Sequence, residues 1–109
     1  KPDSSGVVLI KPQFEAGREK VGKGGVVREP QVHQQVIYDI LTFLSEQGFY
    51  LYGLDFSPIT GPNGNIEFLA HIGRHANHAL CVIDGIVDLS GFHTLSQEIV
   101  NQAHKILKS

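Results

Sequence analysis

Short apolar runs, separated by glycine and proline, predict a chain in which strands alternate with helices. Residues 7–10 form a β-branched and aliphatic run that ends just before Pro12, which cannot donate to a strand ladder. This pattern predicts a strand buried on both faces, as is usual in a parallel sheet. Residues 13–29 then mix glycines with charges of both signs and predict a long loop.

Two amphipathic helices are predicted. The first begins at Pro30, a residue suited to the first helical position, and stops at Gly48. Its apolar stripe, with Ile37 beside it, consists of Val32, Val36, Ile40, Phe43 and Leu44. The second begins near Thr94, because Thr94 and Gln97 have the spacing of a capping box. Its stripe consists of Leu95, Ile99, Ala103 and Ile106.

Two further strands are predicted over residues 50–56 and 66–72, where apolar and polar positions alternate. The turn-rich segment 57–65 joins them, so they should pair antiparallel. The apolar face of the first consists of Tyr50, Tyr52, Leu54 and Phe56. Residues 73–92 predict a loop with a short extra strand. A helical crossover connects the first two strands, so they should run parallel. The pattern as a whole predicts an α/β fold. It corresponds to half of an open sheet, with parallel strands, one antiparallel strand and flanking helices.

Lys11 and Glu67 are the polar residues that this topology brings to one edge of the sheet. Lys11 follows the first strand, and Glu67 lies at the start of the third, which returns from the same edge. Two interpretations are open. The pair is an ordinary surface ion pair with little effect on stability, or it is a catalytic lysine accompanied by a carboxylate.

The composition narrows the classes of protein. A formal net charge of -2 argues against a generally basic nucleic-acid coat, and no apolar stretch has the length of a membrane span. The chain holds no methionine and opens just before a predicted core strand, so we expect a piece of a longer protein. The apolar surroundings of Cys81 predict a buried structural thiol. His71, His75 and His78 lack the companion ligands of a zinc site, so no metal is expected.

Two sequence motifs carry a resemblance to a known family. The first is LIKPQFEAGRE followed by VGKGGVV, and the second is SPI followed by GPNGNIEF. In this order and spacing they resemble the TlyA (hemolysin-like) family, whose members join an RNA-binding S4-type segment to an FtsJ-like methyltransferase domain. The resemblance is dense over residues 6–72 and thins beyond them.

The resemblance implies that residues 1–109 are the carboxy-terminal part of an FtsJ-like domain whose cofactor-binding half is absent. Such enzymes transfer a methyl group from S-adenosylmethionine to a ribose 2′-hydroxyl, here of ribosomal RNA in the cytoplasm. The third and fourth members of the family's Lys-Asp-Lys-Glu tetrad match Lys11 and Glu67. The other two, and the glycine-rich cofactor loop, are expected upstream. The resemblance therefore implies that the chain alone is inactive and contains no cofactor-binding residue.

The cations of the glycine-containing loop have two interpretations as well. They bind RNA phosphates, or they belong to a solvated loop of mixed charge. These residues are Arg18, Lys20, Lys23 and Arg28.

Two other functions stay open for the whole protein. One is a membrane-active hemolysin, which the ordinary core-facing stripes of the helices do not favour. The other is a non-catalytic α/β module that interacts with RNA or protein and keeps Lys11 and Glu67 only as structural residues.

Overall fold

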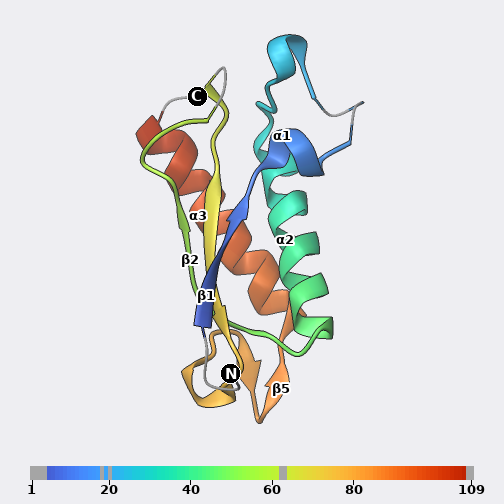
Figure 1. Ribbon diagram of the computed structural model, residues 1–109, viewed down its shortest axis with the longest axis vertical. Coiled ribbons are helices and arrows are strands. Elements are labelled where there is room, and N and C mark those ends of the chain that lie inside the picture. The colour runs from blue at the N-terminus through green and yellow to red at the C-terminus, as the bar shows by residue number, and fades with distance from the viewer. Residues whose placement is uncertain (1–4, 18, 20, 62–63, 108–109) are drawn as a thin grey trace.

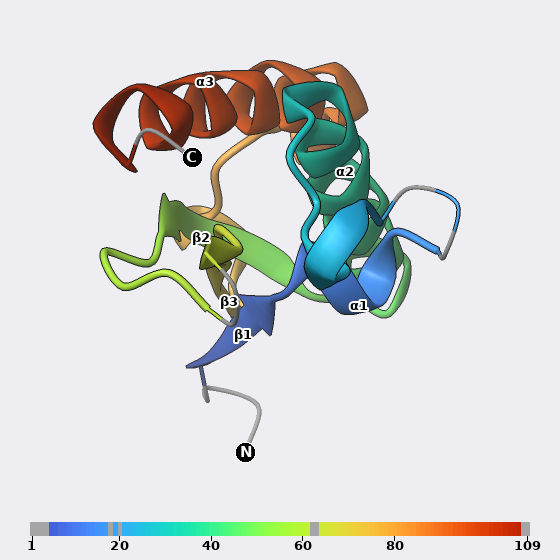
Figure 2. The same cartoon turned by 90° about the horizontal axis from the view of Figure 1, so that it is seen from above.

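A computed structural model describes residues 5–17, 19, 21–61 and 64–107, with Lys23 described by its backbone only. The elements are β1 (Ser5–Ile10), α1 (Pro12–Glu15), η2 (Lys23–Gly25), α2 (Pro30–Glu46), β2 (Tyr50–Phe56), β3 (Phe68–Gly73), η4 (Ala76–His78), β4 (Val82–Ile83), β5 (Ile86–Val87) and α3 (Leu89–Leu107), where η marks a 3-10 helix. Two layers result, a three-stranded sheet and the helices α2 and α3 on one of its faces (Figures 1 and 2).

The strand order of the larger sheet is β1-β3-β2. β3 pairs antiparallel with both neighbours, so β1 and β2 run in the same direction without pairing with each other. The expected mixed α/β fold and the antiparallel β2–β3 pair are confirmed. The predicted common direction of β1 and β2 is thus borne out, but the sheet of the described residues contains only antiparallel pairs, because β3 lies between the two strands that the α2 crossover connects.

The outward face of β1 departs from the predicted burial. Ile10 is fully buried under α2 and α3, but Val7 is 66% exposed and Leu9 is 45% exposed. The prediction that both faces are covered is therefore wrong for the described part of the chain, since its two long helices lie on the same side of the sheet. An apolar strip is left facing away from them.

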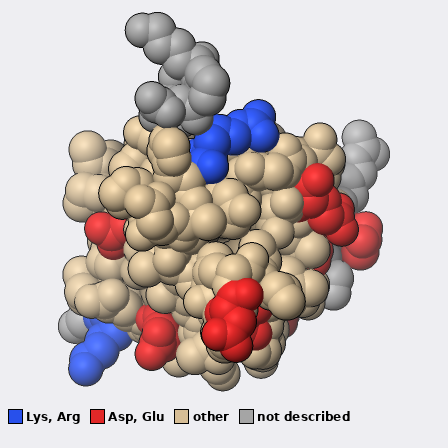
Figure 3. All heavy atoms as spheres, turned by 90° about the horizontal axis from the view of Figure 1, so that it is seen from below, with Lys and Arg blue, Asp and Glu red and all other residues tan. Residues whose placement is uncertain are grey.

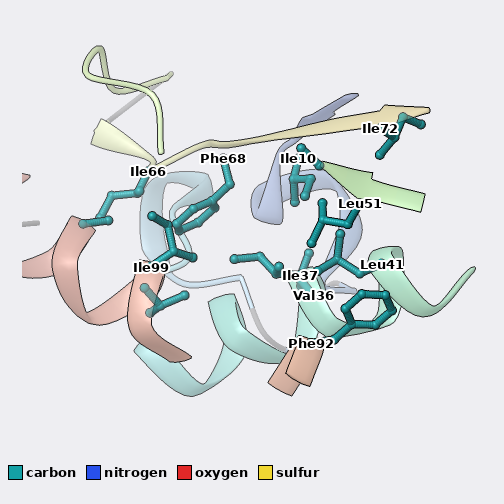
Figure 4. Close-up of a cluster of buried hydrophobic side chains, with 13 residues drawn as sticks. Ile10, Val36, Ile37, Leu41, Leu51, Ile66, Phe68, Ile72, Phe92 and Ile99 are labelled. Atoms are coloured by element: carbon teal, nitrogen blue, oxygen red, sulfur yellow. The ribbon is translucent and has the colours of Figure 1, made fainter. Parts of the chain in front are cut away.

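The core lies between the sheet and the two long helices, as Figure 4 shows. Ile37 points into it from α2 toward Phe68 of β3 and Ile99 of α3, and Leu41 lies beside Leu51 of β2. The helix limits at Pro30 and Gly48 were predicted correctly. Two positions of the predicted stripes are wrong, because each helix turns a slightly different face inward: Phe43 and Ile106 are exposed.

A β-bulge interrupts the predicted alternation of β2. The register with β3 shifts between Leu51 and Gly53, so Tyr52 is the extra residue. Leu51 then faces the core, whereas the Tyr52 ring stacks edge-on against His71 on the other face, 5.3 Å between ring centroids. A side chain at Gly73 would overlap with that ring. Tyr52 therefore does not share the apolar face predicted for residues 50–56.

The last third of the chain is more regular than expected. β4 and β5 form a hairpin whose turn residues Asp84 and Gly85 have φ 52° and 78°, as a tight hairpin turn requires. α3 begins at Leu89, five residues before the predicted start. Cys81, next to the hairpin, was predicted to be buried, but it is only half-buried. Burial raises the pKa of its thiol, and Asp88 adds to the shift.

Candidate active site

Lys11 and Glu67 each lie one residue beyond the last pair of β1 and β3, at the same edge of the sheet. The last pair in the register of β1 and β3 is Ile10 with Phe68. One step further the same register sets Lys11 opposite Glu67, and the backbone of Lys11 is still extended, with φ -117° and ψ 93°. Residues opposite each other on antiparallel strands point to the same face of a sheet. The structure thus brings together two residues that are far apart in the sequence.

Glu67 is held in an enclosed position. Its side chain is 9% exposed, and Oε2 accepts a hydrogen bond of 2.8 Å from Nε2 of Gln13. The backbone of Gly61 passes so close that a Cβ there would overlap with the carboxylate. The carbonyl of Glu67 accepts a bond of 2.8 Å from the amide of Ser57, which extends the pairing of β3 with the end of β2. The carboxylate is therefore fixed from two sides.

The short helix α1 carries Gln13 to this place. Pro12 stands at its first turn, and the carbonyl of Lys11 accepts bonds from the amides of Phe14 and Glu15, at 2.9 and 3.2 Å. The chain therefore turns directly after Lys11, and Gln13 reaches Glu67. Sequence reasoning placed these residues in a loop and assigned no role to Gln13. The proline immediately after a strand was the signal that could have indicated a helical turn.

The polar atoms of this edge are not all paired. Among the described residues no ion pair joins Lys11 to Glu67, so the simple ion-pair interpretation does not describe this structure. The amide oxygen of Gln13, Oε1, is buried and accepts no hydrogen bond from the described residues. A buried acceptor without a partner is costly unless something binds there. Lysine, carboxylate and amide together can hold and polarise a hydroxyl group.

Two hollows next to α1 differ in the charge of the residues that line them. A shallow depression of about 520 Å³ is lined by Gln13, Phe14, Gly17 and Val21. The groove between α1 and α2 has about 330 Å³ and includes the acids Glu15, Glu29 and Asp39. Phosphates are repelled by such an acidic lining, so the groove is unsuited to RNA backbone.

The predicted RNA-binding cations are only partly within the described residues. Arg18 and Lys20 lie outside them, as does the side chain of Lys23. Arg28 is exposed, directly after the buried Val27. At the end of the molecule shown in Figure 3, opposite the Lys11 edge, basic and acidic side chains are scattered and form no basic patch. RNA binding by the four cations stays a prediction.

The histidines that follow β3 form an aromatic group with Tyr52. The hydroxyl of Tyr52 accepts a 2.8 Å bond from the amide of His75, and its ring meets those of His71 and His78. Among the described residues, no group of three or more histidine, cysteine or acidic side chains is arranged to hold a metal ion.

In the same part of the chain, no helix combines the length and apolar character that crossing a bilayer requires.

Comparison with known proteins identifies the class. The sequence pattern of the FtsJ-like methyltransferase family matches residues 2–74. The chain therefore belongs to the FtsJ-like methyltransferases. Within them its relatives are the TlyA, or hemolysin-like, rRNA methyltransferases: it is 37% identical over 78 residues to the 16S/23S rRNA (cytidine-2′-O)-methyltransferase TlyA of Mycobacterium tuberculosis. It is also 55% identical over 71 residues to YqxC of Bacillus subtilis (strain 168).

The chain is much shorter than these relatives. The matched part is 65% of this chain but 25% of YqxC, and 72% of this chain but 29% of TlyA. A solved structure named "Putative hemolysin from Streptococcus thermophilus" superimposes with a TM-score of 0.78 and 43% identity. The superposition covers 97% of this chain and 34% of that one, so the fold described here recurs as one part of a larger protein.

Proposed function

We propose that this chain is the carboxy-terminal part of the methyltransferase domain of an S-adenosylmethionine-dependent rRNA ribose 2′-O-methyltransferase. Two facts support the proposal. The solved relative contains this fold as about a third of its length. The outward strip of Val7 and Leu9 is apolar and exposed in the described residues, as expected of a sheet that further chain covers. In this proposal the sheet is half of a Rossmann-like methyltransferase sheet, and the full protein works on ribosomal RNA or a ribosomal subunit in the cytoplasm.

The adjacent positions of Lys11 and Glu67 carry the proposal. A ribose hydroxyl is a poor nucleophile until its developing negative charge is stabilised or its proton is removed. The ammonium group of a lysine is a compact positive charge with three hydrogen-bond donors. Aimed at the 2′-oxygen, it would stabilise the developing alkoxide. Glu67, fixed by Gln13, would orient the ammonium and accept a hydrogen bond from the ribose.

The cofactor is expected to bind mainly outside this chain. When bound, S-adenosylmethionine supplies a methyl group on a positively charged sulfur. The glycine-rich turn of this chain is not built to hold it, because the amide of Gly22 bonds to the carbonyl of Val26, at 2.8 Å, and the turn neither follows a strand nor opens α2 directly. We assign no residue of this chain to the cofactor.

RNA would approach over the loop that leads into α2. Arg28 is exposed there, and Arg18, Lys20 and Lys23 belong to the same stretch of sequence. Guanidinium and ammonium groups bind backbone phosphates and position the substrate without reading its bases. The acidic groove between α1 and α2 lies beside this loop and would direct the phosphates away from itself.

The test is methyl transfer by the longer protein in which this proposal places the chain. Ribosomal subunits and S-adenosylmethionine with a labelled methyl group are the substrates, and ribose methylation is read by its resistance to alkaline cleavage. Lys11→Ala should lower kcat by about 100-fold or more, the effect of removing one charge-stabilising donor. Glu67→Gln should lower it by about tenfold, because the amide keeps the shape and loses the charge.

The matched control is Lys105→Ala, which removes an exposed lysine from the last turn of α3. Transfer by this variant should equal that of the unmodified protein. Methylation of a base, or full activity of Lys11→Ala in a protein whose far-UV circular dichroism is unchanged, would contradict the proposal.

A further inference from the structure

A buried chain of hydrogen bonds connects α3 to the loop that carries Glu67. His33 of α2 is fully buried, and its Nδ1 lies 2.7 Å from Nε2 of His104 on α3. Its Nε2 lies 2.9 Å from the carbonyl oxygen of Val27. The amide of Val27 donates in turn to Oδ1 of Asn65, at 3.0 Å. Both polar backbone atoms of Val27 are thus occupied by side chains, one from His33 six positions away and one from Asn65 at a separation of 38 positions.

Asn65 joins this chain to the candidate active site. Its side chain is buried, and Nδ2 donates a second bond of 2.9 Å to the carbonyl of Gly25. Its own carbonyl accepts from the amide of Gly61, at 2.7 Å. Gly61 is the residue whose backbone closes over the carboxylate of Glu67, two residues beyond Asn65. One side chain therefore holds residues 25–27 against the segment that shapes the pocket of Glu67.

The geometry fixes where the ring protons lie. A carbonyl oxygen only accepts, so Nε2 of His33 must carry a proton and donate it to Val27. In a neutral ring the other nitrogen is then an acceptor, so Nε2 of His104 must donate to it. A protonated His33 would instead donate through Nδ1 to Nε2 of His104, but while both rings are neutral the two bonds form together only in this tautomer of each ring.

The electrostatic surroundings favour that state. Burial, and then the neighbouring His104, lower the pKa of His33 to about 4, although the carbonyl of Val27 acts in the opposite direction. Burial lowers the pKa of His104 as well. Because both shifts favour uncharged rings, the pair keeps its hydrogen bonds at neutral pH.

We propose that His33 and Asn65, with His104 behind them, are positioning residues that hold Glu67 at the catalytic edge. The proposal rests on the proposed function, since the group that is positioned is the candidate catalytic carboxylate. The loop of residues 21–29 contains several glycines and has no strand partner, so its backbone needs such bonds to keep one conformation. The same bonds fix Arg28, the next residue after Val27, relative to the edge where the ribose would lie.

The experiment compares His104→Gln with His104→Leu in the longer protein. The amide nitrogen of glutamine takes the place of Nε2 and still donates to His33, whereas leucine fills similar space and cannot. We expect kcat for ribose methylation to fall about tenfold in His104→Leu, with KM for S-adenosylmethionine unchanged, and to recover in His104→Gln. Asn65→Asp should also lower kcat, because an oxygen would replace the donor to Gly25. His93→Leu, an exposed histidine on the same helix, is the control.

A second measurement separates this inference from the proposed function. The side-chain amide of Gln13 donates to Glu67, so its NMR signals report the position of the carboxylate. They should shift in His104→Leu and Asn65→Asp and return in His104→Gln. If the unmodified protein transfers no methyl group, the proposed function fails and these signals alone decide the inference. Unshifted Gln13 signals, or unchanged kcat in an active protein bearing His104→Leu, would overturn it.

Discussion

At the scale of single residues, the enclosure of Glu67 explains why glycine stands at position 61. The backbone there approaches the carboxylate so closely that no Cβ fits without a shift. The reason is steric and not conformational, because Gly61 is not among the glycines with positive φ. A side chain at this position would therefore act on the carboxylate itself and not on the turn.

Gly61→Ala should lower methyl transfer by about tenfold, the effect expected of displacing a catalytic group by a fraction of an ångström. Stability should change less, because the new Cβ would meet the end of a flexible side chain and not backbone. Methyl-transfer rates and urea unfolding of the longer protein measure the two effects. Gly6→Ala is the matched control, since a Cβ at Gly6 meets nothing within 4 Å. Equal activity of the two variants would contradict this account.

Some residues of the site could be predicted from the sequence and others could not. Lys11 and Glu67 were predicted to share one edge because both flank strands and the edge follows from the direction of the chain. The role of Gln13 could not be found in this way, because it depends on how α1 turns after Lys11. His33 lies on the same side of α2 as Ile37, where an apolar residue is the usual occupant. Its partner is 71 positions away, and only the packing of α2 on α3 brings the two rings together.

At the scale of elements, predictions succeeded where local chemistry decides the structure. Proline at the start of α2 and Gly48 after its end were reliable signals. The pairing of β1 with β3 is not a local property, so the sequence left open which strands are neighbours. The bulge at Tyr52 likewise depends on its contacts with β3 and Gly73. The start of α3 was predicted too late, near Thr94. Thr94 and Gln97 have the spacing of a capping box, but both lie inside the helix.

Asp88 is the residue that caps α3 in the structure. Its Oδ1 accepts bonds from the amide and the hydroxyl of Ser90, at 3.2 and 2.6 Å. Asp88→Ala should therefore lower the free energy of unfolding by roughly 1 kcal/mol, the usual loss for an N-cap. Thr94→Ala should change it by less than about 0.5 kcal/mol, because its hydroxyl only bonds back to the carbonyl of Ser90 within the helix.

Urea unfolding of the two variants, each compared with the unmodified protein, checks this prediction. It also compares two assignments of the helix start. A larger loss in Thr94→Ala than in Asp88→Ala would show that α3 begins where the capping-box spacing predicted, and the structural assignment would be wrong.

At the scale of the whole molecule, one face of the sheet packs on the core under the two long helices, and the strand β1 exposes apolar side chains on the other face. β1 and β2 are both edge strands in the described residues, and β1 presents an apolar outer face. Edge strands of this kind pair readily with other strands. The 34% coverage of the Streptococcus thermophilus structure fits the view that further chain normally completes this side.

The 109-residue chain alone should neither bind S-adenosylmethionine nor transfer its methyl group. The reason is that, in the proposed function, the glycine-rich cofactor loop and the other two members of the tetrad belong to the rest of the protein. Isothermal titration with S-adenosylmethionine checks binding, and the longer protein is the positive control. Measurable binding by the short chain would show that the cofactor site has been assigned to the wrong part.

The strand order also has a consequence for synthesis on the ribosome. β3 is made last of the three strands but occupies the middle of the sheet. Until residues 68–73 have left the exit tunnel, β1 and β2 cannot pair with β3. Glu67 therefore cannot take its position at the edge of the sheet that Lys11 also occupies. A nascent chain that stalls before residue 67 has left the tunnel therefore contains Lys11 without Glu67, and the candidate active site cannot assemble.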